Sequence, residues 1–371
     1  MFEWKECKLE DVAVFQRGHD LPKTEMSKGN IPVAGSNGII GYHDKLTTKG
    51  PGITIGRSGS IGSPKFYKND FWAHNTVLYV KDFKGNDEKF VFYFLYTFDF
   101  MAFNAGSAVP TLNRNHIHEI SVKVPPLPEQ RAIASILSSL DDKIDLLHRQ
   151  NQTLEAMAET LFRQWFVEEA DEGWEVKPLG NLVTVKRGGS PRPIQEYLSE
   201  TGYRWLKISD ATKENSPYIF EIKEHIKKVG LSKTTLLKSG SLVLSNSATP
   251  GIPKILQVDT CIHDGWLHFP KSYFSNEFLY LLFKIIRPEL LIQGNGSIFT
   301  NLKTDILKEY KISIPDINEL NNFQNSIALI FEKLLKNSNQ IRTLEKLRDT
   351  LLPKLMSGEV RVQSAQGEAA I

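Results

Sequence analysis

The longest regular pattern in the chain is a stripe of apolar residues spaced alternately three and four positions apart, and it occurs twice. The first stripe consists of Ile133, Leu137, Leu140, Ile144, Leu147, Leu154, Ala158, Leu161 and Trp165, with Asn151 at its one polar position. The second consists of Phe323, Ile327, Ile330, Leu334, Asn337, Ile341, Leu344, Arg348, Leu351 and Leu355. This spacing is that of a coiled-coil seam, so it predicts two helices, each about 57 Å long.

The simplest partner for each helix is the other helix. An antiparallel pair would place the domains that precede the helices at opposite ends, whereas a parallel pair would place both at one end. A buried Asn in such a seam costs stability but can fix the register. If the helices are antiparallel with their midpoints level, Asn151 and Asn337 are expected to lie within about one turn of each other.

The segments before each helix show shorter, strand-like patterns. Residues 52–56, 66–67 and 76–80 are β-rich runs separated by turns of Gly, Ser and Asn. Residues 90–103 form an aromatic-rich helical stretch, and residues 278–286 are its counterpart. Aromatic residues at helical spacing are more typical of a core than of a surface for base stacking. The segments are therefore predicted to be mixed α and β.

The two halves of the chain repeat each other in sequence. Trp4, Leu9, Val12, Arg17 and Gly18 recur 170 positions later as Trp174, Leu179, Leu182, Arg187 and Gly188. Gly62, Pro64, Lys65 and His74 recur 189 positions later as Gly251, Pro253, Lys254 and His263, and Leu112 and Glu119 recur after 190 as Leu302 and Glu309. A period this long exceeds the roughly 20–50 residues of a solenoid unit, so it indicates a duplicated domain.

These patterns predict a domain organisation and a division of charge. The expected parts are domain 1 (1–127), helix 1 (128–170), domain 2 (171–315), helix 2 (316–358) and a flexible tail (359–371). The two domains carry 15 basic against 13 acidic and 19 basic against 15 acidic residues, whereas the remaining segments carry 11 against 15. Basic surface attracts phosphate, so nucleic acid is expected on the domains rather than the helices, although ordinary solvated surface remains an alternative explanation.

Several function classes lack their motifs. No phosphate-binding G-x-x-x-x-G-K-[ST] loop, no G-x-G-x-x-G and no Asn-Pro-Pro-aromatic run occurs. Cys7 and Cys261 do not occupy matching positions of the repeat, so neither a disulfide framework nor a cysteine metal site is expected. His116 and His118 are replaced by Ile306 and Lys308 in the second copy, so both are expected to be solvated residues and not metal ligands. No apolar run suits a membrane span or a signal peptide, which predicts a cytoplasmic protein with no membrane partner.

The polar loops of the two domains are the candidate contact surfaces. Arg, Asn, Ser and His side chains can read base edges, Arg favouring guanine and Asn favouring adenine, and neighbouring glycines allow close approach. The candidates in domain 1 are Arg17, Ser36, Asn37, Arg57, Ser58, Ser60, Lys65, His74 and Asn75, and those in domain 2 are Arg187, Ser245, Asn246, Ser247, Lys254, His263 and Asp264. Arg57 becomes Asn246 and Asn75 becomes Asp264 on a repeated framework, as expected for readers of two different sequences, although such loops can also simply turn the chain.

The chain resembles the DNA specificity subunits of type I restriction-modification systems over about residues 1–360. The resemblance rests on Trp4…Leu9-x-x-Val12 and its copy, on the run from Gly35 to Tyr42, on Pro125-Pro126-Leu127-Pro128-Glu129-Gln130-Arg131, and on the ending from Leu351 to Glu359. The second copy departs from this pattern, because residues 315–320 read Pro-Asp-Ile-Asn-Glu-Leu in place of the Pro-Pro-Leu-Pro-Glu-Gln run.

The resemblance implies an α+β fold with two similar target-recognition domains, separated by two long helices in an antiparallel coiled coil, with pseudo-two-fold symmetry. It also implies a non-catalytic subunit that directs adenine methylation and restriction to a bipartite, asymmetric site in double-stranded DNA. The implied partners are two modification subunits using S-adenosylmethionine, and restriction subunits using ATP and magnesium, with no cofactor on this chain. A coiled-coil scaffold with two protein-binding heads remains the alternative, and a self-sufficient DNA methyltransferase would need the missing cofactor loop.

Overall fold

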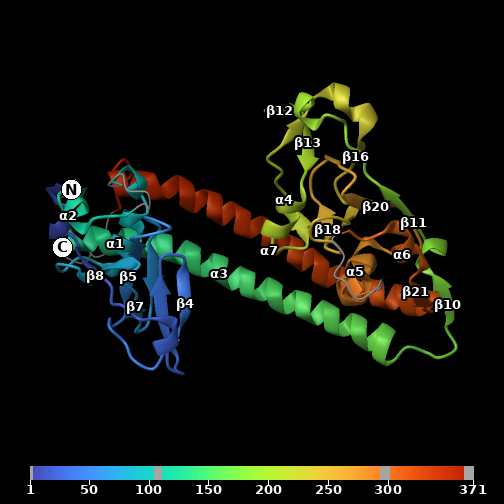
Figure 1. The fold of residues 1–371 in the computed structure, drawn as a ribbon, viewed down its shortest axis with the longest axis horizontal. Coiled ribbons are helices and arrows are strands. Elements are labelled where there is room, and N and C mark those ends of the chain that lie inside the picture. Colours follow the sequence, from blue (N-terminus) through green and yellow to red (C-terminus); the bar gives the residue numbers. More distant parts are fainter. Residues whose placement is uncertain (1–2, 104–110, 293–300, 363–371) are drawn as a thin grey trace, which may run out of the picture. The chain divides into compact units, whose positions relative to one another are not determined.

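The chain divides into two compact units that share two long helices. The computed structural model describes residues 3–103, 111–292 and 301–362. Unit 1 comprises Met1–Asp145 and Arg342–Ile371, and unit 2 comprises Leu146–Ile341. Helix α3 (Leu127–Arg163) passes from unit 1 into unit 2, and helix α7 (Ile317–Ser357) passes back (Figure 1). The mixed α and β fold with an antiparallel helix pair is confirmed.

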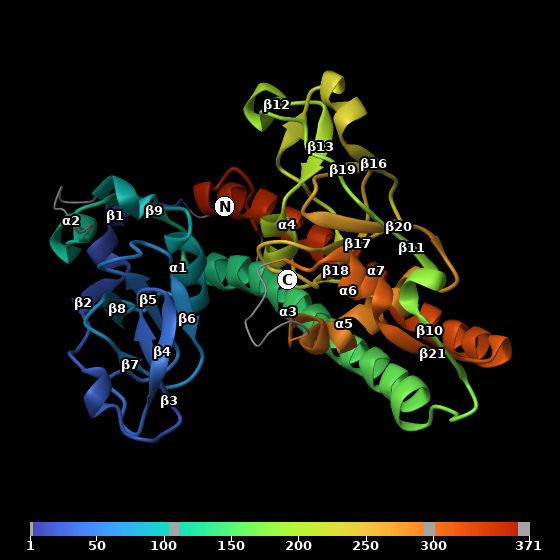
Figure 2. The ribbon, with the colours of Figure 1, turned by 45° about the vertical axis from the view of Figure 1, so that its right-hand side comes forward.

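Unit 1 is built on a four-stranded antiparallel sheet in the order β2-β8-β5-β6, which can be followed from left to right in Figure 2. A three-stranded sheet β4-β3-β7 and the pair β1-β9 complete it. The strands are β1 (Lys5–Lys8), β2 (Val14–Arg17), β3 (Ile31–Gly35), β4 (Gly38–His43), β5 (Gly52–Gly56), β6 (Lys65–Tyr67), β7 (Trp72–Ala73), β8 (Val77–Asp82) and β9 (Ser121–Val124), and the helices before α3 are α1 (Glu88–Leu95) and α2 (Arg114–His118).

Unit 2 repeats this plan with larger sheets, β11-β20-β17-β18-β14 and β12-β15-β13-β19-β16, and the pair β10-β21. Its strands are β10 (Glu175–Pro178), β11 (Val183–Arg187), β12 (Leu198–Ser199), β13 (Tyr203–Leu206), β14 (Tyr218–Ile219), β15 (His225–Ile226), β16 (Thr235–Leu237), β17 (Leu242–Ser245), β18 (Pro253–Leu256), β19 (Thr260–Ile262), β20 (Trp266–Ser272) and β21 (Lys311–Ile314). Its helices besides α3 and α7 are α4 (Ile208–Lys213), α5 (Asn276–Ile292) and α6 (Thr304–Glu309).

Within unit 2 the two long helices are antiparallel. Phe162, late in α3, packs against Phe323, early in α7, with ring centroids 5.8 Å apart. Further along, the Asn337 side-chain amide donates to Asn151 Oδ1 at 3.0 Å, and Asn151 donates to Ser338 Oγ at 3.3 Å. The expected pairing of the two Asn residues is confirmed. Because Asn337 is fully buried, its amide needs this partner, and a slip of the register would remove it.

Within unit 1 the helices are also antiparallel and bring buried leucines and a charged pair together. Leu137 of α3 and Leu355 of α7 are buried in one core cluster. The Arg348 guanidinium donates to Asp141 Oδ1 at 2.9 Å, and the same Asp141 accepts a 2.6 Å bond from Tyr93. Desolvation and this carboxylate raise the Tyr93 pKa, so the phenol stays protonated as the donor.

The predicted seam follows the buried face of these helices. Ile133, Leu137, Ile144, Ile327, Leu334, Asn337 and Ile341 are buried, and Leu140, Asn151, Leu154 and Leu344 are half-buried. Complete burial of a leucine side chain such as Leu137 or Leu334 stabilises the fold by about 2–3 kcal/mol.

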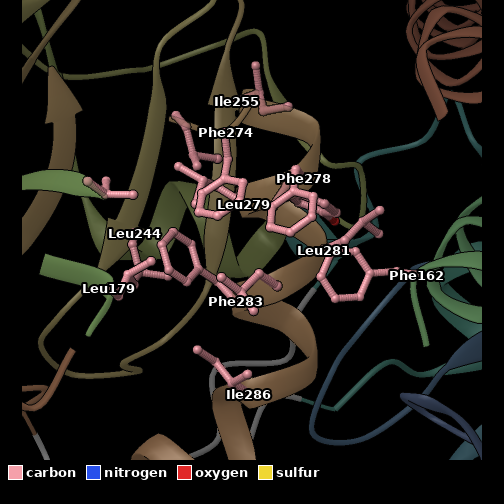
Figure 3. Close-up of a cluster of buried hydrophobic side chains, with 14 of the residues drawn as sticks. Phe162, Leu179, Leu244, Ile255, Phe274, Phe278, Leu279, Leu281, Phe283 and Ile286 are labelled. Atoms are coloured by element: carbon pink, nitrogen blue, oxygen red, sulfur yellow. The ribbon is translucent and has the colours of Figure 1, made fainter. Parts of the chain in front are cut away.

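The main core of unit 2 forms where α5 packs between the sheet and the long helices. Figure 3 shows Phe278 of α5 facing Phe162 of α3, with centroids 4.9 Å apart. On the other side Leu244 of β17 and Phe283 of α5 belong to the same cluster. The aromatic residues of this helix are therefore core, as expected. In unit 1 the expected helix 90–103 is too long, because α1 ends at Leu95 and a separate 3-10 turn covers Phe100–Phe103.

Candidate nucleic-acid interface

In unit 1, polar loops meet at one end of the four-stranded sheet and are joined through their backbones. The Gly18 amide donates to the Val77 carbonyl at 3.0 Å, and the Arg57 amide donates to the Thr76 carbonyl at 2.8 Å. The Arg57 carbonyl in turn accepts from the Leu112 amide at 2.8 Å. This brings the loops that carry Arg17, Arg57 and His74 into one cluster, which we call the unit 1 loop cluster.

Unit 2 repeats these three hydrogen bonds at the equivalent positions. The Gly188 amide donates to the Trp266 carbonyl at 2.9 Å, the Asn246 amide to the Gly265 carbonyl at 2.9 Å, and the Leu302 amide to the Asn246 carbonyl at 2.7 Å. We call this arrangement the unit 2 loop cluster. The glycines of both clusters are required, since a Cβ at Gly188 would lie 2.3 Å from a main-chain oxygen and one at Gly18 only 2.1 Å from the equivalent oxygen.

The structure leaves four of the nine unit 1 candidates exposed and the other five half-buried. Asn37 lies at the tip of the hairpin that joins β3 and β4, where Gly38 has a φ of 114° that suits glycine. The side chain of Arg17 is 52% exposed, with its guanidinium 3.6 Å from Asp20 Oδ1. Asn37, Ser60 and Lys65 are also exposed, whereas Ser36, Arg57, Ser58, His74 and Asn75 are half-buried.

In each cluster one hydrogen bond between two side chains joins two loops, and we call this bond the loop lock. The donor and the acceptor occupy opposite positions of the repeat in the two units. In unit 1 the Asn75 amide donates to the carboxylate of Asp20. In unit 2 the Ser190 hydroxyl donates to Asp264 Oδ1 at 2.6 Å. Asp20 and Ser190 are 170 positions apart, and Asn75 and Asp264 are 189 apart, which are the same offsets as in the sequence repeat. The lock is thus common to both units, while the polar groups it leaves at the surface differ.

Asp264 also holds two arginines. Its main-chain carbonyl accepts from Arg187 Nε at 3.2 Å and Nη2 at 2.8 Å, and its Oδ2 accepts from Arg192 Nη2 at 3.2 Å. The Ser190 hydroxyl and then the Arg192 guanidinium lower the pKa of the Asp264 carboxyl, although partial burial opposes them. Both carboxylate oxygens therefore have a protein donor, so Asp264 is placed to orient Arg192 rather than to read a base itself.

Three candidates of unit 2 require correction because they are buried. Ser245 is fully buried, donating to the Thr249 carbonyl and accepting from the Ile252 amide, so it shapes the loop. Asn246 is 2% exposed, and within the described residues its Oδ1 has no hydrogen-bond partner. The Lys254 ammonium donates to the carbonyls of Glu214 and Ser216, and burial lowers its pKa to about 8. None of the three presents its side chain to a ligand here.

Two histidines, His263 and His118, accept hydrogen bonds from the backbone and support local structure. His263 Nδ1 accepts from the Gly265 amide at 2.8 Å, and burial lowers the pKa of His263. A neutral ring is needed for this bond, because a protonated Nδ1 cannot accept. His118 was expected to be solvated, but its Nε2 accepts from the Phe15 amide at 2.9 Å and burial lowers its pKa. It therefore supports the fold of unit 1.

A cleft of about 820 Å³ adjoins the unit 2 loop cluster, and among the residues that line it the sequence analysis named only His263. Trp205 and His263 line it with ring centroids 5.8 Å apart, and Arg192 and the ion pair of Lys207 with Glu224 also line it. Comparing the two copies two positions beyond Gly18 and Gly188 would have drawn attention to Asp20 and Ser190, which form the loop locks. Arg192 carried no such signal, since it has no counterpart at the equivalent place in unit 1.

Among the described residues there is neither a cluster of side chains that could hold a metal ion nor a helix that could cross a membrane. No group of three or more His, Cys, Asp or Glu side chains among the described residues is placed to hold an ion. Among the same residues, no helix has the length and apolar character needed to cross a bilayer.

Comparison with known proteins identifies relatives over nearly the whole chain. The family of the type I restriction modification DNA specificity domain matches residues 1–156 and 171–348. The MjaIX specificity subunit of a type I restriction enzyme from Methanocaldococcus jannaschii is 28% identical, covering 97% of this chain and 81% of that protein. A putative type I specificity subunit from Haemophilus influenzae, S.HindORF215P, is 27% identical, covering 91% and 89%.

A crystal structure shares the fold. The S subunit of a type I restriction-modification system from M. genitalium superposes with a TM-score of 0.67 at 17% identity, covering 95% of this chain and 96% of that one. These matches do not favour the alternative of a coiled-coil scaffold with two protein-binding heads.

Proposed function

The chain belongs to the family of type I restriction-modification DNA specificity domains, and from this premise we propose that its two units read two separate blocks of one asymmetric DNA site. It is a DNA specificity subunit of a type I restriction-modification system and not itself the catalyst. In the proposal, unit 1 reads one block through its loop cluster and unit 2 reads the other. The bases between the blocks form a spacer that neither unit reads.

The observation that carries this proposal is a common backbone with different side chains. Both loop clusters have the same three backbone hydrogen bonds. Their surfaces differ: Arg57 and the Asp20–Asn75 lock belong to unit 1, whereas Arg192 and Asp264 belong to unit 2. The equivalent arginines also differ in partner, since Arg17 lies near the Asp20 carboxylate and Arg187 donates to the Asp264 main-chain carbonyl. Base specificity depends on the pattern of donors and acceptors in the major groove, so different surfaces on one scaffold favour different target sequences.

The chain acts with other subunits of its complex, and we propose that these include two modification subunits bound at the shared helices and, in the complete enzyme, restriction subunits. The acidic balance of the helical segments, 11 basic against 15 acidic residues, favours protein rather than phosphate as their partner. S-adenosylmethionine, ATP and magnesium would then be bound by the partner subunits, and the assembly would work on DNA in the cytoplasm.

Mapping methylated adenines in host cells with and without this gene tests the proposal. Seven residues inserted after Asp145 in α3 and seven after Ile341 in α7 would add about 10 Å of helix, or about three base pairs of DNA. The spacer should lengthen by about that amount while both blocks keep their sequences. A control insertion after Gly85, in an exposed turn of unit 1, should leave the spacer unchanged. An unaltered spacer in the double insertion would contradict the proposal.

A further inference from the structure

We propose that Arg192 reads a guanine in the block recognised by unit 2, and that Asp264 is the positioning residue that orients its guanidinium. The inference rests on the proposed function and assigns a residue and a base to it. Guanine presents two adjacent acceptors, O6 and N7, in the major groove, and a planar guanidinium can donate to both at once.

The first support is the geometry around Arg192. Its side chain is 79% exposed, yet Nη2 is fixed 3.2 Å from Asp264 Oδ2. Asp264 is itself held by the Ser190 hydroxyl on Oδ1 at 2.6 Å. One guanidinium edge is thus engaged by the protein while most of the side chain faces solvent. An arginine held in this way loses less conformational freedom on binding a base than a free one does.

The second support is that Arg192 has no counterpart in unit 1. Each unit has a short 3-10 helix after this loop, Lys23–Glu25 and Ile194–Glu196, and each is preceded by a proline, Pro22 and Pro193. The stretch from the loop glycine to that proline is one residue longer in unit 2. The extra length carries Arg192, flanked by Pro191 and Pro193, so the guanidinium belongs to unit 2 alone.

The third support is the position of Arg192 between the loop cluster and the adjoining cleft. Arg187 donates to the main-chain carbonyl of Asp264, so two guanidiniums are bound to one residue. Lys207 lines the same cleft and is neutralised by Glu224. A basic rim next to an open cleft suits the edge of a base with a phosphate nearby. Of the two cations that line the cleft, Arg192 is the more exposed, at 79% of its side chain against 47% for Lys207.

The test is selection from a duplex pool randomised at both blocks, using the complex isolated through a tag on the full chain. Wild type should enrich one sequence per block. Arg192→Ala should lose the preference for guanine at one position of one block by roughly 5- to 150-fold, leaving the other block unchanged. Arg192→Lys should keep overall affinity but lose much of this preference, because an ammonium cannot form the paired bonds.

Asp264→Asn tests the positioning role, since it keeps an acceptor for Ser190 but removes the charge that holds Arg192. The preference at the same position should fall while thermal unfolding and the rest of the block stay as in wild type. The matched control is Lys238→Ala, whose side chain is 78% exposed and pairs with Asp259 at 2.6 Å in the same unit. It should leave both blocks unchanged.

Three outcomes would overturn the proposal. A loss in Arg192→Ala that is equal for all sequences, with a salt dependence reduced by about one phosphate contact, would make Arg192 a phosphate ligand. An unchanged selection would make it an ordinary surface ion pair, and altered preference in both blocks would mean damage to the fold. Failure of the wild type to enrich any sequence would instead count against the proposed function.

Discussion

The two units use the same backbone frame but bury equivalent residues differently. Lys65 and Lys254 occupy the same place in the repeat, yet Lys65 is exposed on β6 whereas Lys254 is buried on β18. The neighbouring strand explains the difference. In unit 1, β6 is the edge strand of its sheet. In unit 2 a further strand, β14, pairs with β18, and the segment just before β14 places main-chain carbonyls against the Lys254 ammonium. The additional strand therefore explains why the lysine at this position is exposed in unit 1 but is buried and hydrogen-bonded to the backbone in unit 2.

The comparison also teaches how a duplicated domain can diverge. The three repeated hydrogen bonds use only main-chain atoms, so side chains can change without disturbing the frame. The hydrogen bond between the two loops is kept although its direction is reversed. In unit 1 the donor is Asn75 and the acceptor is Asp20, and in unit 2 the donor is Ser190 and the acceptor is Asp264. Side chains that face outward from this backbone can therefore differ between the two units, as recognition of different DNA sequences requires.

The largest expected effects come from placing a charge in the helix seam of one unit. Leu137→Asp and Leu334→Asp each bury a carboxylate at a fully buried position, and this should cost several kcal/mol of unfolding free energy. Hydrogen exchange should show lost protection in unit 1 for the first variant and in unit 2 for the second. Leu329→Asp, at a position 70% exposed on α7, is the control and should stay within about 0.5 kcal/mol. Equal loss in both units would show that they unfold as one.

Exchanging the two equivalent lysines for alanine should separate structure from binding. Lys254→Ala leaves two carbonyls without their donor and should cost about 2–4 kcal/mol in chemical denaturation. Lys65→Ala should leave the stability within about 0.5 kcal/mol but reduce the salt dependence of DNA binding by about one phosphate contact. If both variants lose stability equally, the difference in burial has no energetic consequence.

Arg57→Ala should weaken recognition of the block read by unit 1 by about 1–3 kcal/mol if the guanidinium contacts a base bidentately. The block read by unit 2 should not change. Binding to duplexes altered in one block at a time measures this. Losses in both blocks, or in neither, would assign Arg57 to the fold or to phosphates. The equivalent Asn246 is buried, so Asn246→Ala should affect stability before base preference.

The smallest expected effect is a pH dependence in unit 2. Burial lowers the pKa of His263 below its usual 6.5, so on acidification the unfolded chain takes up this proton first, and stability should fall as the pH drops below about 6.5. In His263→Asn the amide oxygen can accept from the Gly265 amide without titrating. Denaturation at pH 7.5 and 5.5 should therefore show a larger loss for wild type. Equal losses would exclude this role for His263.

Much of the fold could be predicted because its signals are local. The three-four spacing of apolar residues defined α3 and α7, and the Asn in each stripe anticipated the contact of Asn151 with Asn337. The β-rich runs at residues 52–56 and 76–80 predicted the strands β5 and β8. The end of α1 at Leu95 was missed, because the aromatic pattern continues through Phe103 while the backbone changes to a 3-10 turn.

The periodic patterns and the repeat offsets were sufficient to specify the two long helices, the duplication and the candidate loops, since each depends on neighbouring positions or on direct comparison within the chain. They could not show that Lys254 is buried, that each carboxylate oxygen of Asp264 accepts a hydrogen bond, or that Arg192 is held beside a cleft. Each of these depends on segments far apart in the sequence that pack together. Burial and hydrogen bonding are properties of that packing, so identical positions in the repeat acquired opposite roles in the two units.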